Sequence, residues 1–175
     1  MVRFLAYNIG QVLSYETIGR ECELSSPCVA DYLSLLEQSF IIRVLPSFSR
    51  NLSNELKKSK KIYFCDLGIR NAAINDFSPF STRNDTERGA LWENFFAIQR
   101  MKYHDYRRTG VNLFFWRNKF KNEVDLVEVD GDNLNCFECK VTKDNVTLPD
   151  AFARVYPQCT FSVATTKNFY RYFQK

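Results

Sequence analysis

Two charged residues stand in the middle of NLNCFECKV, residues 133–141, a stretch that otherwise has the pattern of a buried strand. Glu138 and Lys140 are two positions apart, so an extended backbone puts their side chains on one face of the strand. Cys139 lies between them and points to the opposite face. Because an unpaired charge is very unfavourable inside a protein, this carboxylate and this ammonium indicate a polar site on their face.

A third charged residue, Asp125, lies in the preceding strand pattern, NEVDLVEVD over 122–130. The Asp-Gly pair between the two patterns is typical of a hairpin turn, so the strands should be antiparallel neighbours, with Asp125 close to Glu138. Two close carboxylates repel unless a cation or a proton lies between them, and Mg²⁺ prefers carboxylate and water oxygens. We therefore expect both carboxylates to bind Mg²⁺, with Lys140 orienting or deprotonating a water or stabilising phosphate charge.

A further carboxylate, Glu93, lies in the helical pattern TERGALWENFFAIQRMKYHDY over 86–106. Most residues around it are apolar and favour burial, so this glutamate needs a partner. Glu93 is therefore a candidate third carboxylate of the same site.

Hydrophobic patterning predicts the elements that must position these residues, in the order α-β-β-β-α-β. After the helix over 86–106 we expect strands over 111–117, 122–130 and 133–141, a helix over 148–156 and a strand over 159–165.

The first third of the chain has a different order, which is typical of a winged helix-turn-helix. The expected elements are helices over 2–13, 15–22 and 27–40, followed by strands over 41–48 and 60–66. Ser25 or Ser26 is the expected N-cap of the third helix, with Pro27 at its first position. Residues 67–85 are polar and rich in turn formers.

We therefore predict an α+β protein with a winged-helix domain over 1–66, a linker over 67–85 and an α/β domain over 86–175. The chain has 45% hydrophobic residues and a net charge of +4, which permits contact with nucleic acid without demanding it. No apolar run approaches the roughly 20 residues that span a bilayer. The N-terminus lacks a signal-peptide cleavage pattern, so we expect a cytoplasmic protein with no membrane partner.

The charged residues and the order of elements resemble the PD-(D/E)XK nuclease superfamily, which has the restriction-endonuclease-like fold. RGALWE is similar to the opening helix of archaeal Holliday-junction resolvases. The resemblance implies that Asp125 and Glu138 bind a divalent metal and that Glu93 is an accessory ligand. It also implies that Lys140 is the catalytic lysine, which assists the attacking water. The chain departs from the motif at Val124, where the superfamily often has proline.

Several stretches, in order, also resemble the C-terminal region of prokaryotic AAA-type ATP-binding proteins. They are VADYLSLLEQSFIIRVLP, KKIYFCDLGIRNA, RGALWENFFA, LFFWRNKFKNEVDLVEV and CFECKV. In that family an ATPase module precedes a winged helix and a nuclease-like domain. The chain has no G-x-x-x-x-G-K-[ST], so the resemblance implies an ATPase module N-terminal to it in the full-length protein.

Two regions are candidates for contact with DNA. The expected wing is basic, through Arg50, Lys57, Lys58, Lys60 and Lys61, and either contacts phosphates or is a solvated loop. The expected recognition helix has no Lys or Arg, so protein docking is an equal alternative for the winged helix. Residues 100–110, RMKYHDYRRTG, either bind single strands or form a solvated helix end with His104 on the surface.

The leading function is a DNA-associated, metal-dependent nuclease module of an ATPase. The alternative is a non-catalytic interaction module, in which the polar cluster is retained without catalysis and Lys140 pairs with Glu138 or Glu93. A zinc site at Cys136 and Cys139 is not expected, because positions three apart on a strand point to opposite faces.

Overall fold

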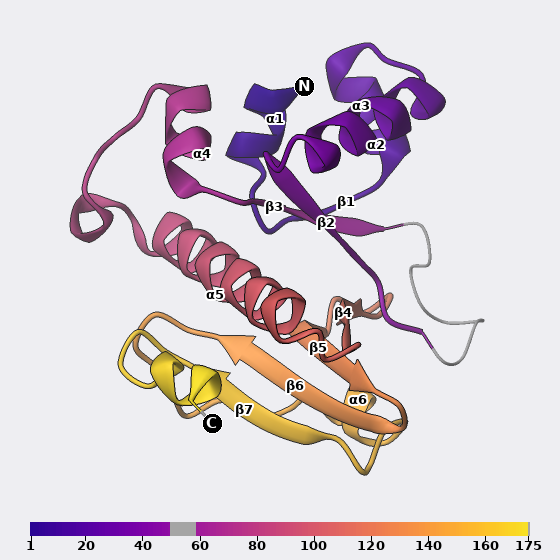
Figure 1. Cartoon of the computed structure of the whole chain (residues 1–175), viewed down its shortest axis with the longest axis vertical. Helices are drawn as coiled ribbons and strands as arrows, with labels where there is room; N and C mark the ends of the chain where they lie inside the picture. The colour runs from indigo at the N-terminus through magenta and orange to yellow at the C-terminus, as the bar shows by residue number, and fades with distance from the viewer. Residues whose placement is uncertain (50–58, 175) are drawn as a thin grey trace. The chain divides into compact units, whose positions relative to one another are not determined.

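The computed structural model describes residues 1–49 and 59–174 and shows a mixed α+β protein with two sheets (Figure 1). The strand orders are β1-β3-β2 and β4-β5-β6-β7. The chain divides into two compact units, residues 1–45 with 58–98, and residues 46–57 with 99–175. No helix in the described ranges is long and apolar enough to cross a membrane.

The first unit contains three N-terminal helices, a three-stranded sheet and a fourth helix. Its elements are α1 (Val2–Tyr7), β1 (Val12–Leu13), α2 (Tyr15–Cys22), α3 (Ser26–Gln38), β2 (Ile42–Pro46), β3 (Lys60–Phe64), α4 (Leu67–Ile74), the 3-10 helix η1 (Phe80–Thr82) and the first part of α5 (Asp85–Arg107). The predicted N-cap of α3 is confirmed, since the Ser25 hydroxyl accepts the Cys28 N–H at 3.4 Å. Buried Leu5, Ile18 and Val29, one from each N-terminal helix, belong to the same core.

The predicted helix over 2–13 is wrong in its second half. The helix ends at Tyr7, and the chain then turns into β1, which pairs with β3. Gly10 adopts a φ of +72° in this turn, and a side chain there would meet Glu93 Oε1 at 3.4 Å. The left-handed conformation and the close approach explain why the apolar spacing does not continue as a helix.

Part of the predicted linker over 67–85 is helical and belongs to the first core. Asp66 Oδ1 accepts the Gly68 N–H at 2.6 Å and caps α4. At the other end of α4, Ile74 is buried. The compact units divide within α5 (Asp85–Arg107), not within the predicted linker.

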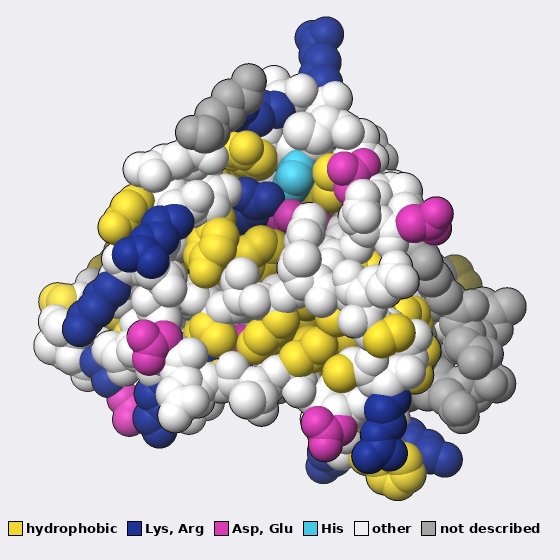
Figure 2. All heavy atoms as spheres, turned by 90° about the horizontal axis from the view of Figure 1, so that it is seen from below, with side chains coloured by type: hydrophobic (Ala, Val, Ile, Leu, Met, Phe, Trp, Pro, Cys, Tyr) yellow, Lys and Arg dark blue, Asp and Glu magenta, His cyan; other side chains and the backbone are white. Residues whose placement is uncertain are grey.

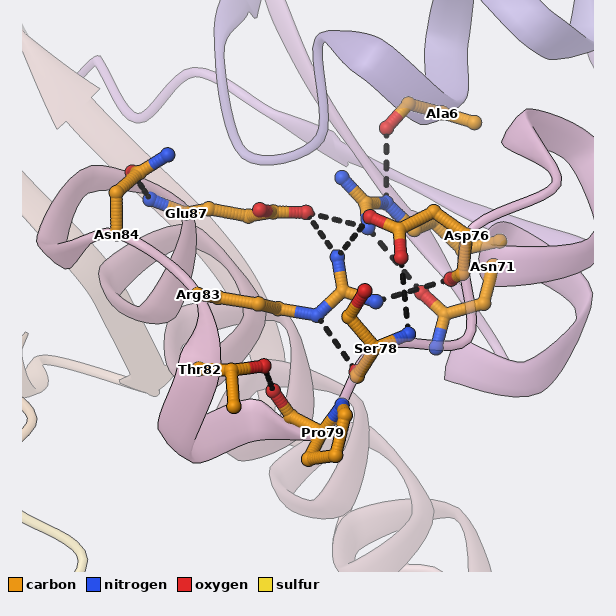
Figure 3. A network of polar contacts seen from close by, with 10 residues as sticks. Ala6, Asn71, Asp76, Ser78, Pro79, Thr82, Arg83, Asn84 and Glu87 are labelled. Carbon is orange, nitrogen blue, oxygen red and sulfur yellow. Dashed lines mark hydrogen bonds and ion pairs between the residues drawn. The ribbon is translucent and has the colours of Figure 1, made fainter.

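Two buried arginines fix the segment that leads from α4 to α5 (Figure 3). The guanidinium groups of Arg70 and Arg83 both donate to Glu87 Oε1. Arg70 Nε also donates to the Ala6 carbonyl at 3.0 Å, and Arg83 Nη1 lies 2.9 Å from Asp76 Oδ2. This network ties α1, α4 and the start of α5 together, which makes the segment a structured part of the first unit.

The second unit follows the predicted order of elements. After the C-terminal part of α5 come β4 (Asn112–Arg117), β5 (Glu123–Asp130), β6 (Asn133–Cys139), α6 (Asp150–Ala153), β7 (Thr160–Ala164) and the 3-10 helix η2 (Phe169–Phe173). The first three strands are antiparallel, and β7 is parallel to β6. Helix α6 is shorter than predicted, with four residues.

The two faces of this four-stranded sheet have different surroundings. Val127 and Cys136, which face each other in the register, pack with Phe152 of α6 in an apolar core. Their neighbours Glu128 and Phe137 contact Arg100 of α5. Because side chains alternate along strands, α6 and the end of α5 lie on opposite faces of the sheet.

The prediction that His104 is a surface residue is wrong, because its side chain is buried in a polar cluster. Arg100 donates to both carboxylate oxygens of Glu128, from Nε at 2.6 Å and from Nη2 at 2.9 Å. His104 Nε2 lies 3.2 Å from Glu128 Oε1, and its Nδ1 lies 2.7 Å from Thr109 Oγ1. Because Glu128 is buried, its charge needs partners, and Arg100 and His104 are therefore buried beside it.

Candidate functional site

Asp125 and Glu138 come together on neighbouring strands of the second unit. The antiparallel register of β5 and β6 ends with Leu126 opposite Phe137, and Asp125 and Glu138 are the next residue of each strand. Asp125 is buried, and its Oδ2 accepts the N–H of Cys139 at 2.8 Å. This backbone contact fixes one oxygen of Asp125 beside the end of β6.

A β-bulge in β5 lies at the position of Asp125. Phe114 pairs with Val127 but Trp116 pairs with Val124, so β5 has one residue more than β4 over this stretch. Such bulges change the direction of a side chain and are frequent beside active sites. The strict alternation assumed from the sequence does not hold here, and the apolar NEVDLV pattern contains no signal for the extra residue.

Lys140 forms an ion pair with Glu138, with Nζ and Oε1 2.7 Å apart. The Glu138 side chain is 15% exposed and the Lys140 side chain 40% exposed, so solvent can reach the pair. The Lys140 N–H donates to the Ala164 carbonyl at 3.1 Å, which continues the pairing of β6 with β7. Cys139 between them is buried, as the alternation predicted.

The carboxylates beside Lys140 keep its side chain charged. Burial lowers the pKa of Lys140, but the hydrogen bond and charge of Glu138 and the charge of Asp125 outweigh this effect, so the pKa is raised above its ordinary value. The ammonium is therefore protonated at neutral pH. Of the roles considered from the sequence, orienting a water or stabilising negative charge agrees with a protonated lysine.

Glu93 lies in the first unit, where its carboxylate accepts hydrogen bonds from side chains of β3. Lys61 Nζ donates to Glu93 Oε1 at 2.7 Å, and the Tyr63 hydroxyl donates to the same oxygen at 2.6 Å. The partner that the sequence demanded for Glu93 thus includes a lysine from β3. No local pattern identifies this contact, because Lys61 and Glu93 are far apart in the sequence.

The predicted DNA-binding lysines have different surroundings. Arg50, Lys57 and Lys58 lie outside the described residues. Lys60 is partly exposed, whereas Lys61 is 0% exposed, so its inclusion among the phosphate-binding lysines was wrong. On the face that Figure 2 shows, basic side chains are scattered, with one group at the lower right, and hydrophobic side chains form a band.

The described residues contain no group of three or more His, Cys, Asp or Glu that could hold a metal ion. A cation at Asp125 and Glu138 would therefore have two carboxylate ligands from the second unit. Mg²⁺ commonly binds to one or two carboxylates and takes its other ligands from water and phosphate oxygens. The pair of carboxylates fits such a site in its chemistry.

Two family models match the chain. Residues 1–79 match a domain of unknown function, DUF8612, and residues 88–173 match a second one, DUF4143. Asp125, Glu138 and Lys140 all lie in the second match.

Two curated relatives align with 73% of the chain. Protein Mb2031c of Mycobacterium bovis and protein Rv2008c of Mycobacterium tuberculosis, both called uncharacterized, are each 26% identical to it over 128 residues. The aligned segment is 73% of this chain but 28% of each relative, so the chain spans little more than a quarter of their length. No solved structure matches the chain.

Proposed function

We propose that the second unit is a nuclease-like domain of the PD-(D/E)XK type, which binds a divalent cation and cleaves phosphodiester bonds of nucleic acid. The observation that carries the proposal is the position of Asp125 and Glu138 at adjoining ends of neighbouring strands, where both carboxylates act on the Lys140 ammonium. The order of elements and the parallel pairing of β7 with β6 support the same assignment.

The whole protein would be an AAA-type ATPase that carries this module at its C-terminal end. DUF4143 domains are typically C-terminal domains of AAA-type ATPases. The order of helices and strands over residues 1–66 supports a winged helix as the first unit. We place the protein in the cytoplasm of a prokaryote, with DNA as the partner of the module.

Asp125 and Glu138 would hold the Mg²⁺ ion, which when bound supplies a polarised phosphate and a more acidic water. The Cys139 N–H keeps one oxygen of Asp125 oriented, so little rearrangement is needed on binding. Lys140 would stabilise negative charge on the phosphate, because its ammonium stays protonated beside the two carboxylates.

Calorimetry with Mn²⁺ tests the metal site. Asp125→Asn is the best variant, because its amide oxygen can still accept the Cys139 N–H, whereas alanine would leave a buried donor unsatisfied. We expect Asp125→Asn to abolish Mn²⁺ binding and to leave the fold intact. Asp130→Ala, an exposed carboxylate at the end of β5, is the matched control and should bind normally. Equal Mn²⁺ affinity in the wild type and the Asn variant would refute the metal site.

A plasmid-nicking assay tests the reaction. Lys140→Ala should bind Mn²⁺ and fail to cleave, whereas Lys140→Arg should retain part of the activity because it keeps a cation. Lys143→Ala, at an exposed lysine, is the control and should cleave as the wild type does. Metal binding without cleavage of single-stranded, duplex or branched DNA or RNA would leave the non-catalytic alternative.

A specific observation favours that alternative for the first unit. Helix α3 exposes two apolar side chains one turn apart, Tyr32 and Leu35, and Phe40 is exposed just after the helix. Residues 21–42 contain four acidic side chains and no Lys or Arg. DNA phosphates would be repelled by this face, whereas a cationic amphipathic segment of a partner protein would find complementary charge and apolar contact.

Binding of a cationic amphipathic peptide, made of leucine and lysine, distinguishes the two functions. An interaction module should lose affinity for the peptide on Leu35→Asp and keep it on Lys140→Ala. Equal peptide affinity in the wild type and Leu35→Asp would exclude α3 as the docking surface. Fluorescence anisotropy of the labelled peptide measures both affinities.

A further inference from the structure

The turn between β4 and β5 projects an aromatic side chain into solvent. Phe120 is 74% exposed, although phenylalanine is among the residues that proteins most often bury. Lys119 and Lys121 flank it and are exposed, and Lys119 Nζ lies 5.1 Å from the centre of the ring. An exposed ring between two cations combines the two features that bind single-stranded nucleic acids, a stacking surface and phosphate contacts.

A single side chain organises the backbone of this turn. Asn118 Oδ1 accepts the N–H of Phe120 at 2.9 Å and the N–H of Asn122 at 3.0 Å. The Asn118 N–H in turn donates to the Asn122 carbonyl at 3.0 Å. Lys121 completes the turn with a left-handed φ of +66°. Because the turn is held in this way, little backbone entropy is lost when the ring meets a ligand.

The turn leads directly into the strand that carries Asp125. Phe120 and Asp125 are separated by five steps along the chain, which span at most about 18 Å at roughly 3.6 Å per residue. A stacked DNA strand advances about 3.4 Å per nucleotide, so this reach corresponds to about five nucleotides. A single nucleic-acid strand that stacks one base on Phe120 is therefore long enough to bring a phosphate to Asp125 and Glu138.

We propose that Phe120, with Lys119 and Lys121, stacks on a base of single-stranded or unpaired nucleic acid and selects the phosphate that reaches the site. Every base has a π-face, so the contact tolerates different sequences. In an intact duplex the faces of the bases are covered by their neighbours, so the preferred substrate has unpaired nucleotides. The inference deepens the proposed nuclease-like function and rests on it for the choice of nucleic acid as the ligand.

Anisotropy measurements with a labelled oligonucleotide of about 12 nucleotides, longer than the five-nucleotide reach, test the contact. DNA and RNA of the same sequence are compared in EDTA, which prevents metal-dependent cleavage. Phe120→Ala should weaken binding roughly 5- to 150-fold, the range for the loss of one stacked base, and Phe120→Trp should retain it. Phe77→Ala removes a ring that is 68% exposed in the first unit, and it should leave binding unchanged.

Two further readouts separate stacking from charge. A 2-aminopurine in the oligonucleotide should lose fluorescence on binding to the wild type and keep it with Phe120→Ala. The double variant Lys119→Ala/Lys121→Ala should flatten the slope of log affinity against log salt by about 0.7 for each lost phosphate contact. Phe120 is exposed, so circular dichroism should show the same fold in every variant.

Three results would overturn the inference. They are equal affinity in the wild type and Phe120→Ala, no binding by the wild type, and a larger effect of Phe120→Ala on anionic phospholipid vesicles than on oligonucleotides. A wild type that binds through Phe120 in EDTA but cleaves nothing in Mn²⁺ would keep the stacking site and refute the nuclease. Cleavage in Mn²⁺ that does not depend on Phe120 would refute the stacking site and keep the nuclease.

Discussion

Replacing Glu93 by glutamine tests whether this carboxylate is a partner for a buried lysine. Lys61 is 0% exposed, and its ammonium lies 2.7 Å from Glu93 Oε1, which also accepts the Tyr63 hydroxyl. Glutamine has nearly the same shape, so the substitution removes the charge and leaves no cavity. The ammonium would then remain in the interior beside a neutral amide.

The expected loss of stability is about 3 kcal/mol. Breaking a buried ion pair by removing one partner destabilises proteins by about 3–5 kcal/mol. The lower end applies here because the amide oxygen of glutamine can still accept both hydrogen bonds. For a chain of 175 residues, about 2–4 °C per kcal/mol converts this loss to a fall of about 6–12 °C in Tm.

Urea unfolding followed by tryptophan fluorescence measures the effect in the first unit. The chain has two tryptophans, Trp92 in the first unit and Trp116 in the second. A Trp116→Phe background therefore reports on Trp92 alone. Glu21→Gln, at an exposed surface pair, is the control and should change stability by less than about 0.5 kcal/mol.

A second substitution separates charge from shape. Lys61→Met combined with Glu93→Gln removes both charges and should return stability to within about 1 kcal/mol of the wild type, because apolar replacement of a buried pair is often neutral. A loss below 1 kcal/mol for Glu93→Gln, with no recovery in the double variant, would refute the reasoning. Unchanged stability with weaker Mn²⁺ binding would instead support the accessory-ligand role that the sequence suggested.

Two other predictions concern Asp76 and Glu128, two carboxylates that form ion pairs with arginines. The side-chain and backbone hydrogen bonds of Ser78, and then the charge of Arg83, lower the pKa of Asp76 below 3.8. The stability that this carboxylate contributes is therefore present above about pH 4 and is lost as pH falls through the folded pKa, which an NMR titration of Asp76 should show. Glu128→Gln should destabilise the second unit by about 3–5 kcal/mol, because Arg100 loses its partner; Trp116 fluorescence in urea checks this, and a loss below 1 kcal/mol would contradict it.

Patterns within one element predicted most of the fold. The period of apolar residues located α2, α3, α5 and the four strands of the second unit, because each pattern is a property of a few neighbouring residues. Helix α4 was missed, since its capping by Asp66 and its packing were hidden in a polar, turn-rich composition. The first helix was predicted too long, because the apolar spacing continues on both sides of Gly10, whose left-handed φ turns the chain.

The sequence predicted which residues belong to the candidate site, but it predicted only part of their contacts. The hairpin predicted that Asp125 and Glu138 lie on neighbouring antiparallel strands, because that argument uses a short stretch of chain. The sequence also indicated that Glu93 needs a partner, yet it could not choose between a metal ion and Lys61, which lies on another element. Glu93 and Glu128 share this feature: the sequence shows that an acid is embedded among apolar residues, and only the tertiary structure supplies the base that neutralises it. Carboxylates whose partners are buried lysine or arginine side chains stabilise the fold. The carboxylates to test first as metal ligands are therefore Asp125, fixed by a backbone N–H, and Glu138, whose ion pair with the partly exposed Lys140 solvent can reach.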